Sequence, residues 1–230
     1  MIPDIGYIAL VLAFGVSIYA AFSAWYGNRS EQIRWVESGR NATVIVLPLV
    51  ALSAGMLIFS ILRNDYSVEY VWRVSSRDMS TYLKVTALWG GQAGSLLFWN
   101  FLMASFAAMV MARKWRQNLN LMPYVIIVIS MTQVFFLGIS AFIENPFARL
   151  AMVPLDGNGL NPLLRHPGMI IHPPMLYLGF TGFVIPYAFA MAALISGQLD
   201  DRWIRNTRRW TLVAWLFLSL GLILGGRWAY

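Results

Sequence analysis

The stretch "IGYIALVLAFGVSIYAAFSAWYGN", Ile5–Asn28, contains no Asp, Glu, Lys or Arg and is almost wholly apolar. Further uncharged stretches follow at 41–62, 85–112, 117–143, 166–199 and 210–226. Even the shortest can form a membrane-crossing helix, which needs roughly 17–25 mainly apolar residues. Buried helices of soluble proteins rarely come in such a series. The sequence therefore predicts an all-α integral membrane protein with about six transmembrane helices.

The composition agrees, because 59% of the residues are hydrophobic and 12% are charged, whereas a soluble domain carries about a quarter charged residues. We expect a single membrane domain, 1–230, with helices near 5–28, 42–62, 86–112, 120–143, 172–196 and 210–226. The first stretch follows "MIPD", without a basic region or a cleavage site, so its helix is expected to stay in the mature protein. The chain has no cysteine, which excludes disulfides and thiolate metal sites.

The net charge of +7 is explained by membrane topology rather than by a nucleic-acid partner, because the basic residues lie between the apolar stretches. Compact basic clusters, "RKWR" at 113–116 and "RNTRR" at 205–209, fall in loops on one side of the predicted membrane. Positive-inside counting gives short loops most weight. We therefore expect these loops in the cytoplasm, and both termini and the longer loops 63–85 and 144–171 on the extracytoplasmic side. Long ordered loops tend to be functional, which makes the outer face the expected working face.

The third predicted helix opens with "TALWGGQAGSLLFWNF", Thr86–Phe101. Gly90 and Gly94 are four residues apart, as are Gly91 and Ser95, and Trp89 precedes them. Small residues at this spacing let another backbone, or a flat ligand, approach closely. Helix packing and contact with a cofactor or substrate are both compatible with this pattern. In the fourth helix, Gln133 is expected to hydrogen-bond a neighbouring helix.

Both histidines lie in "RHPGMIIHPPMLYLGF", Arg165–Phe180. Pro173 and Pro174 suit the first turn of a helix, where a missing N–H costs little. His172 is therefore expected just before that helix, at the outer surface, with one ring nitrogen open. A structural, hydrogen-bonded histidine is one interpretation. The other is a ligand, because ionisable groups near membrane segments are functional candidates and neutral imidazole binds iron and zinc.

His166 and His172 do not form a convincing joint metal site. Zinc would need further ligands, and six residues of separation would require a tight loop around a haem whose axial ligands approach opposite faces. His172 could supply one axial position, the other coming from elsewhere, and His166 has no assigned role. Catalytic motifs such as H-E-x-x-H or a phosphate-binding glycine loop are missing from the sequence. The apolar stretches hold no carboxylate for a proton relay.

Two motifs resemble a known family: "WGGQAGSLLFW", Trp89–Trp99, and "NPLLRHPGMIIHPPMLYLGFTGF", Asn161–Phe183. They are similar to motifs of the CcmF/NrfE/CcsA family, haem lyases of c-type cytochrome biogenesis. The segment "YSVEYVWRVSSRDMSTYLKVTALWG", Tyr66–Gly90, resembles the family's approach to its Trp-Gly-Gly helix. The second motif is long and idiosyncratic, so chance is a poor explanation.

The resemblance implies a multi-pass protein of the bacterial plasma membrane that handles haem b, as substrate, on the outer face. The family receives haem from a haem chaperone and joins its vinyl groups to cysteine thiols of apocytochrome c, alongside thiol-handling biogenesis subunits. Its HPP histidine is an axial haem ligand and falls on His172, supported by Pro173 and Pro174. Trp89, Gly90, Gly91, Gly94 and Ser95 fall on the family's hallmark helix, expected to pack near the site.

The family continues beyond a "WAY"-like sequence into a tryptophan-rich haem platform, a second outer histidine and two transmembrane histidines. Here the sequence ends at Trp228-Ala229-Tyr230. By the family plan this chain holds one of four ligands, so alone it lacks most of the haem site. A split gene, with a second chain carrying the platform, and a fragment of a longer protein both fit.

The expected function is a haem-handling subunit of a cytochrome c synthetase that helps position haem for thioether attachment. The alternative is a non-catalytic membrane scaffold or assembly subunit with no haem of its own. A permease is disfavoured, because the sequence shows no inverted repeat and no paired broken helices.

Overall fold

The computed structural model describes residues 1–113 and 119–229, and within these ranges it has six apolar spans long enough to cross a membrane. The spans are α1 (Ile2–Arg29), α2 (Ile33–Leu62), α5 (Gln92–Arg113), α6 (Met122–Gly138) extended by η3 (Ile139–Ile143), α7 (Gly168–Gly182) with α8 (Val184–Ser196), and α9 (Arg202–Ala229). The predicted all-helical membrane fold is confirmed at this level.

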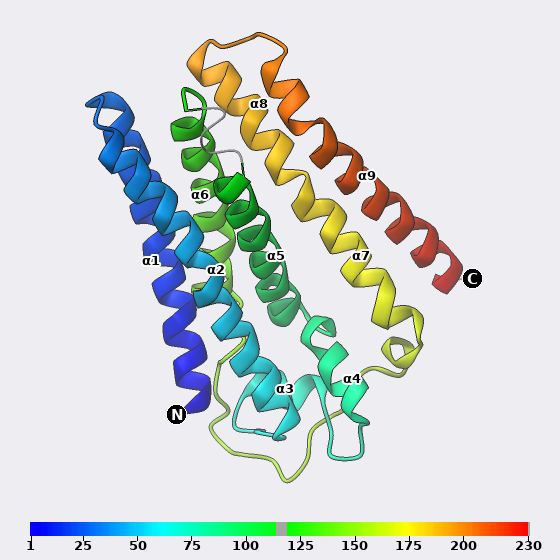
Figure 1. Cartoon of the computed structure of the whole chain (residues 1–230). Coiled ribbons are helices and arrows are strands. Elements are labelled where there is room, and N and C mark those ends of the chain that lie inside the picture. The colour runs from blue at the N-terminus through cyan, green and yellow to red at the C-terminus, as the bar shows by residue number, and fades with distance from the viewer. Residues whose placement is uncertain (114–118, 230) are drawn as a thin grey trace.

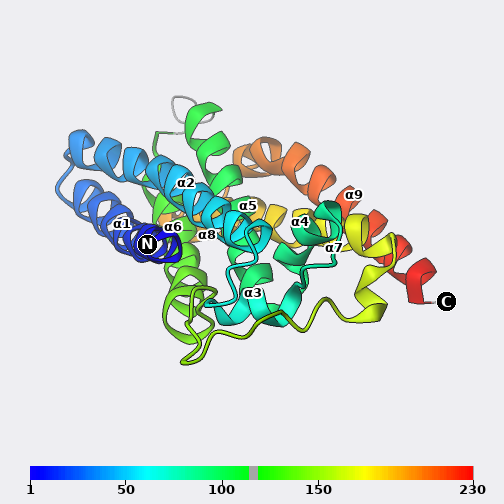
Figure 2. The same cartoon turned by 90° about the horizontal axis from the view of Figure 1, so that it is seen from below.

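The spans form three side-by-side groups (Figures 1 and 2). The α1–α2 hairpin lies at one edge, α5 and α6 occupy the middle, and α9 lies at the other edge along α7 and α8. One buried cluster joins α1, α2 and α5, and a second joins α5, α6 and α8. The groups therefore share one continuous helical core.

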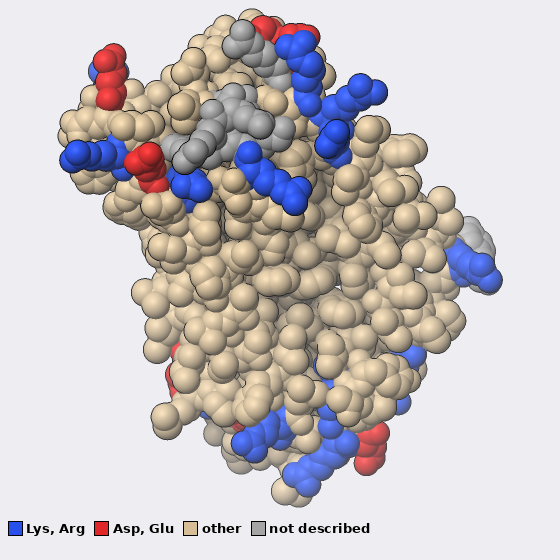
Figure 3. Space-filling view, in the orientation of Figure 1, with Lys and Arg blue, Asp and Glu red and all other residues tan. Residues whose placement is uncertain are grey.

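Most charged residues gather at the two ends of the molecule, and the surface between them is uncharged apart from one basic group at the right edge (Figure 3). Such a largely uncharged belt matches the hydrocarbon layer of a membrane, which disfavours charge. Two helices begin before the uncharged stretches that predicted them. The helix α2 begins at Ile33 rather than near residue 42, and α9 begins at Arg202 rather than near residue 210. Of the basic cluster expected at 113–116, only Arg113 lies among the described residues.

Buried polar side chains join α5 to α6 inside this belt. The Asn100 amide nitrogen donates to the Ser140 hydroxyl at 2.9 Å and to the Phe136 carbonyl at 3.3 Å. Gln133 is 1% exposed, yet neither amide atom has a hydrogen-bond partner among the described residues. The predicted interhelical hydrogen bond of Gln133 is therefore wrong, and the polar link between α5 and α6 lies two turns further along α6.

The first long connection contains α3 (Glu69–Val74), α4 (Thr81–Thr86) and η1 (Ala87–Trp89). The helix expected from about residue 86 is thus interrupted, and α5 begins at Gln92. Gly90 and Gly91 lie at the interruption, and glycine disfavours a helix interior by roughly 0.8–1 kcal/mol relative to alanine. Trp89 therefore lies in η1 rather than in α5.

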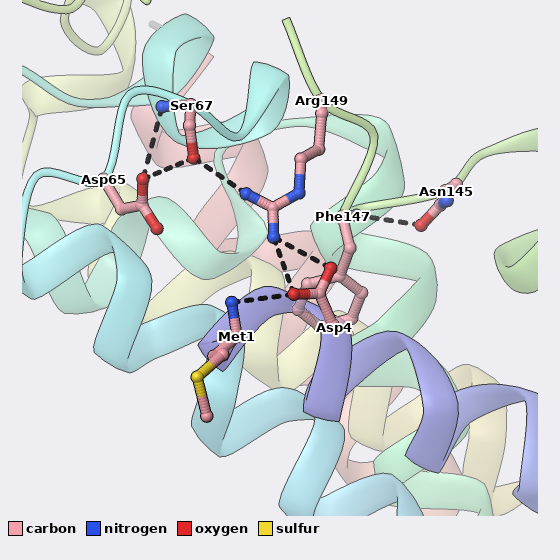
Figure 4. A network of polar contacts seen from close by, with 7 residues as sticks. All are labelled: Met1, Asp4, Asp65, Ser67, Asn145, Phe147 and Arg149. Carbon is pink, nitrogen blue, oxygen red and sulfur yellow. Dashed lines mark hydrogen bonds and ion pairs between the residues drawn. The ribbon is translucent and has the colours of Figure 1, made fainter.

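The two long connections bind one another at the same end of the molecule. An isolated bridge pairs Val68 with Arg149, and the Gly159 N–H donates to the Ser75 carbonyl at 3.0 Å. Arg149 also donates to the Asp4 carboxylate at 2.8 Å and to the Ser67 hydroxyl at 3.2 Å (Figure 4). Loop 144–167 is thereby fastened to α1 and to the segment before α3.

Asp156 supplies a further link between the connections. Its carboxylate accepts the Arg77 backbone N–H at 3.0 Å and the Gly157 N–H at 2.7 Å. These donors lower the pKa of Asp156, because they favour its charged form. A Cβ at Gly157 would lie 2.0 Å from the Ser75 carbonyl oxygen, so this close approach requires glycine.

Candidate functional site

His172 lies inside α7 rather than before it. The helix begins at Gly168, so His172 is in its second turn, with Pro173 and Pro174 in the helix body. Upstream, His166 Nδ1 accepts the Gly168 N–H at 3.0 Å. This side chain accepts a hydrogen bond from one of the first N–H groups of the helix, which have no acceptor within the helix. The helix can therefore begin before Pro173 and Pro174, which were expected in its first turn. The expectation that His172 precedes the helix is therefore wrong.

The imidazole of His172 points to α9. His172 Nδ1 lies 2.8 Å from the Gly221 carbonyl oxygen. Because a carbonyl only accepts, Nδ1 carries the proton in this contact. The neutral ring then has its lone pair on Nε2, and an imidazole held in this way by a backbone carbonyl is the usual arrangement of a metal-binding histidine.

Two residues of α9 complete the surroundings of the ring. A Cβ built on Gly225 would lie 2.5 Å from His172 Cε1 and 3.1 Å from Nε2. The Trp228 ring centroid lies 5.9 Å from that of His172, with the planes 38° apart. The imidazole therefore packs directly on the helix backbone at Gly225, next to an aromatic ring.

The close approach of α7 and α9 continues along both helices. A Cβ at Gly179 would meet Leu218 at 2.6 Å, and one at Gly182 would meet the Ala214 Cβ at 2.9 Å. In the other direction, a Cβ at Gly221 would lie 2.9 Å from Leu176. Glycines on each helix let the backbone of the other helix approach closely, as small residues do at the interfaces of membrane helices.

Pro173 explains a contact with the Trp-Gly-Gly segment. A proline has no N–H, so the Met169 carbonyl loses its usual donor four residues on. The Trp89 indole Nε1–H donates to this carbonyl at 2.9 Å. One proline thus creates a free acceptor in α7, and the first residue of the other motif fills it.

The remaining residues of the Trp-Gly-Gly motif contact three neighbours. Ser95 accepts a hydrogen bond from the Tyr177 hydroxyl of α7 at 3.2 Å. Gly91 and Gly94 instead face Tyr70, since a Cβ at Gly94 would lie 2.2 Å from the Tyr70 hydroxyl. Gly90 faces Leu160 of the long loop. Protein side chains occupy the space at these glycines, and Trp89 and Ser95 reach the helix that carries His172.

The two histidines are arranged differently. His166 is exposed and uses Nδ1 to accept the Gly168 N–H, whereas His172 is half-buried against α9. No group of three or more His, Cys, Asp or Glu side chains that could hold a metal occurs within residues 1–113 and 119–229.

Sequence reasoning missed the α9 side of the site. Gly221 and Gly225 are four residues apart in "GLILG", the same spacing noted for Gly90 and Gly94, and could have marked a close helix contact. The Gly221 carbonyl and the Met169 carbonyl are backbone groups, so no residue type indicated their roles.

The comparisons with known proteins point in one direction. The family model described as "Cytochrome C assembly protein" matches residues 89–230, a range that contains both motifs. The chain is 40% identical to the cytochrome c-type biogenesis protein CcmF of Pseudomonas aeruginosa. It is 39% identical to the protein of that name in Escherichia coli, and 34% identical to the cytochrome c-type biogenesis protein NrfE of Haemophilus influenzae.

A solved structure titled "Cytochrome c Heme Lyase CcmF" is similar along the whole chain, with a TM-score of 0.85 and 26% identity. These matches cover 100% of this chain but 35–36% of the relatives. The chain therefore spans about a third of the length of the proteins it resembles. Together with the six apolar spans, the matches indicate a multi-pass membrane protein.

Proposed function

This chain belongs to the cytochrome C assembly protein family, and from that premise we propose that it is the haem-handling part of a cytochrome c synthetase. Its substrate is haem b, which it helps to position for attachment to apocytochrome c on the outer face of the bacterial plasma membrane. Because the chain spans 35% of the relative named CcmF in Pseudomonas aeruginosa, the whole activity needs further protein segments.

His172 is the residue assigned to the haem iron. The hydrogen bond from Nδ1 to the Gly221 carbonyl, 2.8 Å long, carries the assignment. It fixes the tautomer whose Nε2 binds metal and holds the ring in one orientation. The neutral imidazole is a standard axial ligand of haem iron. The second axial ligand and the tryptophan-rich platform come from another chain or a further segment.

The chemistry asked of this chain is positioning. Addition of a thiol across a vinyl group forms a carbon–sulfur bond, moves the thiol proton to the neighbouring carbon, and needs no net oxidant or reductant. Fixing the haem relative to two peptide thiols lowers the entropic barrier to that step. Keeping the thiols reduced falls to partner subunits, since this chain contains no cysteine.

The partners are a haem chaperone and apocytochrome c, both on the outer side. Loop 144–167 supports docking at that end, because it exposes an apolar run of Met152, Val153 and Leu155. Its neighbours Arg149 and Asp156 hold this loop in place. A contiguous exposed apolar patch is typical of protein or membrane interaction sites.

The test is to purify the chain with its remaining synthetase segments and record haem absorption per protein. We expect His172→Ala to lose most bound haem and most cytochrome c maturation. His166→Ala is the matched control, since its ring is exposed and is expected to leave haem content unchanged. Equal haem in wild type and His172→Ala would remove the ligand assignment and favour the scaffold alternative.

A further inference from the structure

We propose that α9 positions His172: the Gly221 carbonyl selects the metal-binding tautomer, and the Cβ-free surface at Gly225 holds the ring in place. The inference rests on the proposed haem function. It goes beyond that function by assigning positioning residues on a second helix, 49 residues along the chain from the histidine.

The position of the proton on the imidazole decides which nitrogen can bind iron. In a free neutral histidine either nitrogen can carry the proton, and only the unprotonated nitrogen can bind iron. The contact of 2.8 Å between Nδ1 and the Gly221 oxygen favours the form with hydrogen on Nδ1. Nε2 is then ready to bind metal without a proton shift or a ring flip.

The imidazole of His172 leaves no space for a side chain at position 225. The smallest side chain at position 225 would place its Cβ 2.5 Å from His172 Cε1 and 3.1 Å from Nε2. The ring would have to move away from α9 and thereby stretch the bond to Gly221. Gly225 is therefore required for the hydrogen bond as well as for the helix contact.

Close contacts along α7 and α9 fix the register of the two helices. The contacts of Gly179 with Leu218 and of Gly221 with Leu176 lie on the same helix pair. They oppose sliding of α7 along α9, which would carry His172 past the Gly221 carbonyl. The helix pair thus fixes both the height and the orientation of the imidazole.

The decisive measurement is the tautomer of His172 in the haem-free full chain, using 15N-labelled histidine and NMR in detergent micelles. The chain has two histidines, and His166→Gln assigns the signals. We expect Nδ1 of His172 protonated and Nε2 unprotonated at a pH where the ring is neutral. A proton on Nε2, or an equal mixture of both forms, would overturn the inference.

A pair of variants tests the role of Gly225. Gly225→Ala should shift the His172 ring signals and weaken haem binding about tenfold or more, the range seen when partners of a metal ligand are lost. Gly226→Ala is the control, because its Cβ would meet nothing within 4 Å. The His166 signals report whether Gly225→Ala is still folded. Unchanged His172 signals and unchanged haem affinity in a folded Gly225→Ala protein would contradict the assignment.

The two proposals fail in different ways. If haem content does not depend on His172 but Nδ1 carries the proton, the haem function fails while the α9 contact stands. If haem content depends on His172 but Nε2 carries the proton in the haem-free chain, the ligand assignment stands and positioning by α9 is wrong.

Discussion

At the scale of single residues, Gln133 is the least satisfied side chain of the membrane core. It is 1% exposed, and neither its Nε2 nor its Oε1 finds a partner among the described residues. Burying such a group costs about 1–3 kcal/mol. We therefore expect Gln133→Leu to raise the free energy of unfolding by about that amount, measured as a higher midpoint of thermal unfolding in detergent.

Asn100 is the matched comparison for Gln133. It is 2% exposed, but its amide nitrogen donates to Leu96, Phe136 and Ser140. Asn100→Leu should lower the unfolding midpoint, because it removes these bonds. A fall in the midpoint for Gln133→Leu as large as that for Asn100→Leu would mean that Gln133 does hold a partner in the folded membrane protein.

The sequence allowed His172 to be singled out at this scale, but its surroundings could not be derived. An ionisable residue beside a long apolar stretch is conspicuous in any sequence. Its partner is a backbone carbonyl, which every residue possesses, so no residue type at position 221 marks it. For the same reason the role of Met169 could not be predicted, because Trp89 donates to its backbone carbonyl and not to its side chain.

At the scale of elements, Trp89 and Pro173 form a pair that couples η1 to α7. The indole donates to the Met169 carbonyl, which Pro173 deprives of a helical donor. We expect Trp89→Phe to destabilise the protein by about 1–3 kcal/mol, since it leaves a buried carbonyl unpaired. In the Pro173→Ala background, the backbone N–H at position 173 can donate to the Met169 carbonyl. Trp89→Phe should then lower the free energy of unfolding by about 1 kcal/mol less than it does in the wild type.

A double-mutant cycle on the unfolding midpoints measures this coupling. Loss of ring area on changing tryptophan to phenylalanine occurs in both backgrounds and cancels in the difference. The idea fails if the two substitutions are additive within about 0.5 kcal/mol. Tyr177→Phe serves as a control, because it removes the bond to Ser95 and leaves Met169 untouched.

Element boundaries were harder to predict than element existence. Apolar stretches identify the part of a helix that faces lipid, whereas a helix ends where its backbone donors and acceptors find other partners. Hence α2 extends back to Ile33 and α7 begins at Gly168, with His166 accepting an early N–H. At the break before Gln92, Gly91 and Gly94 pack against Tyr70, a contact that spacing alone does not reveal.

At the scale of the whole molecule, the N-terminus and both long connections lie at one end of the helical bundle (Figure 1), and α9 ends beside the start of α7. Asp4 of α1 binds Arg149 of loop 144–167, and Trp228 of α9 lies against Gly168 at the start of α7. The sequence predicted this common side from an even number of spans. Which membrane face it occupies follows from the positive-inside rule, and we propose the extracytoplasmic face.

Single cysteines decide this orientation, because the chain has none of its own and hence no background labelling. Leu155, 89% exposed, lies in loop 144–167, and Leu199, 69% exposed, lies at the opposite end, between α8 and α9. A membrane-impermeant maleimide added to whole cells, or to spheroplasts where an outer membrane excludes it, should label Leu155→Cys and spare Leu199→Cys. Both should react after lysis, which controls for expression and exposure. Labelling of Leu199→Cys alone would reverse the topology. It would also place His172 on the cytoplasmic side, since its helix begins beside Trp228 at the Leu155 end, and the proposed outer-face delivery of haem would then be wrong.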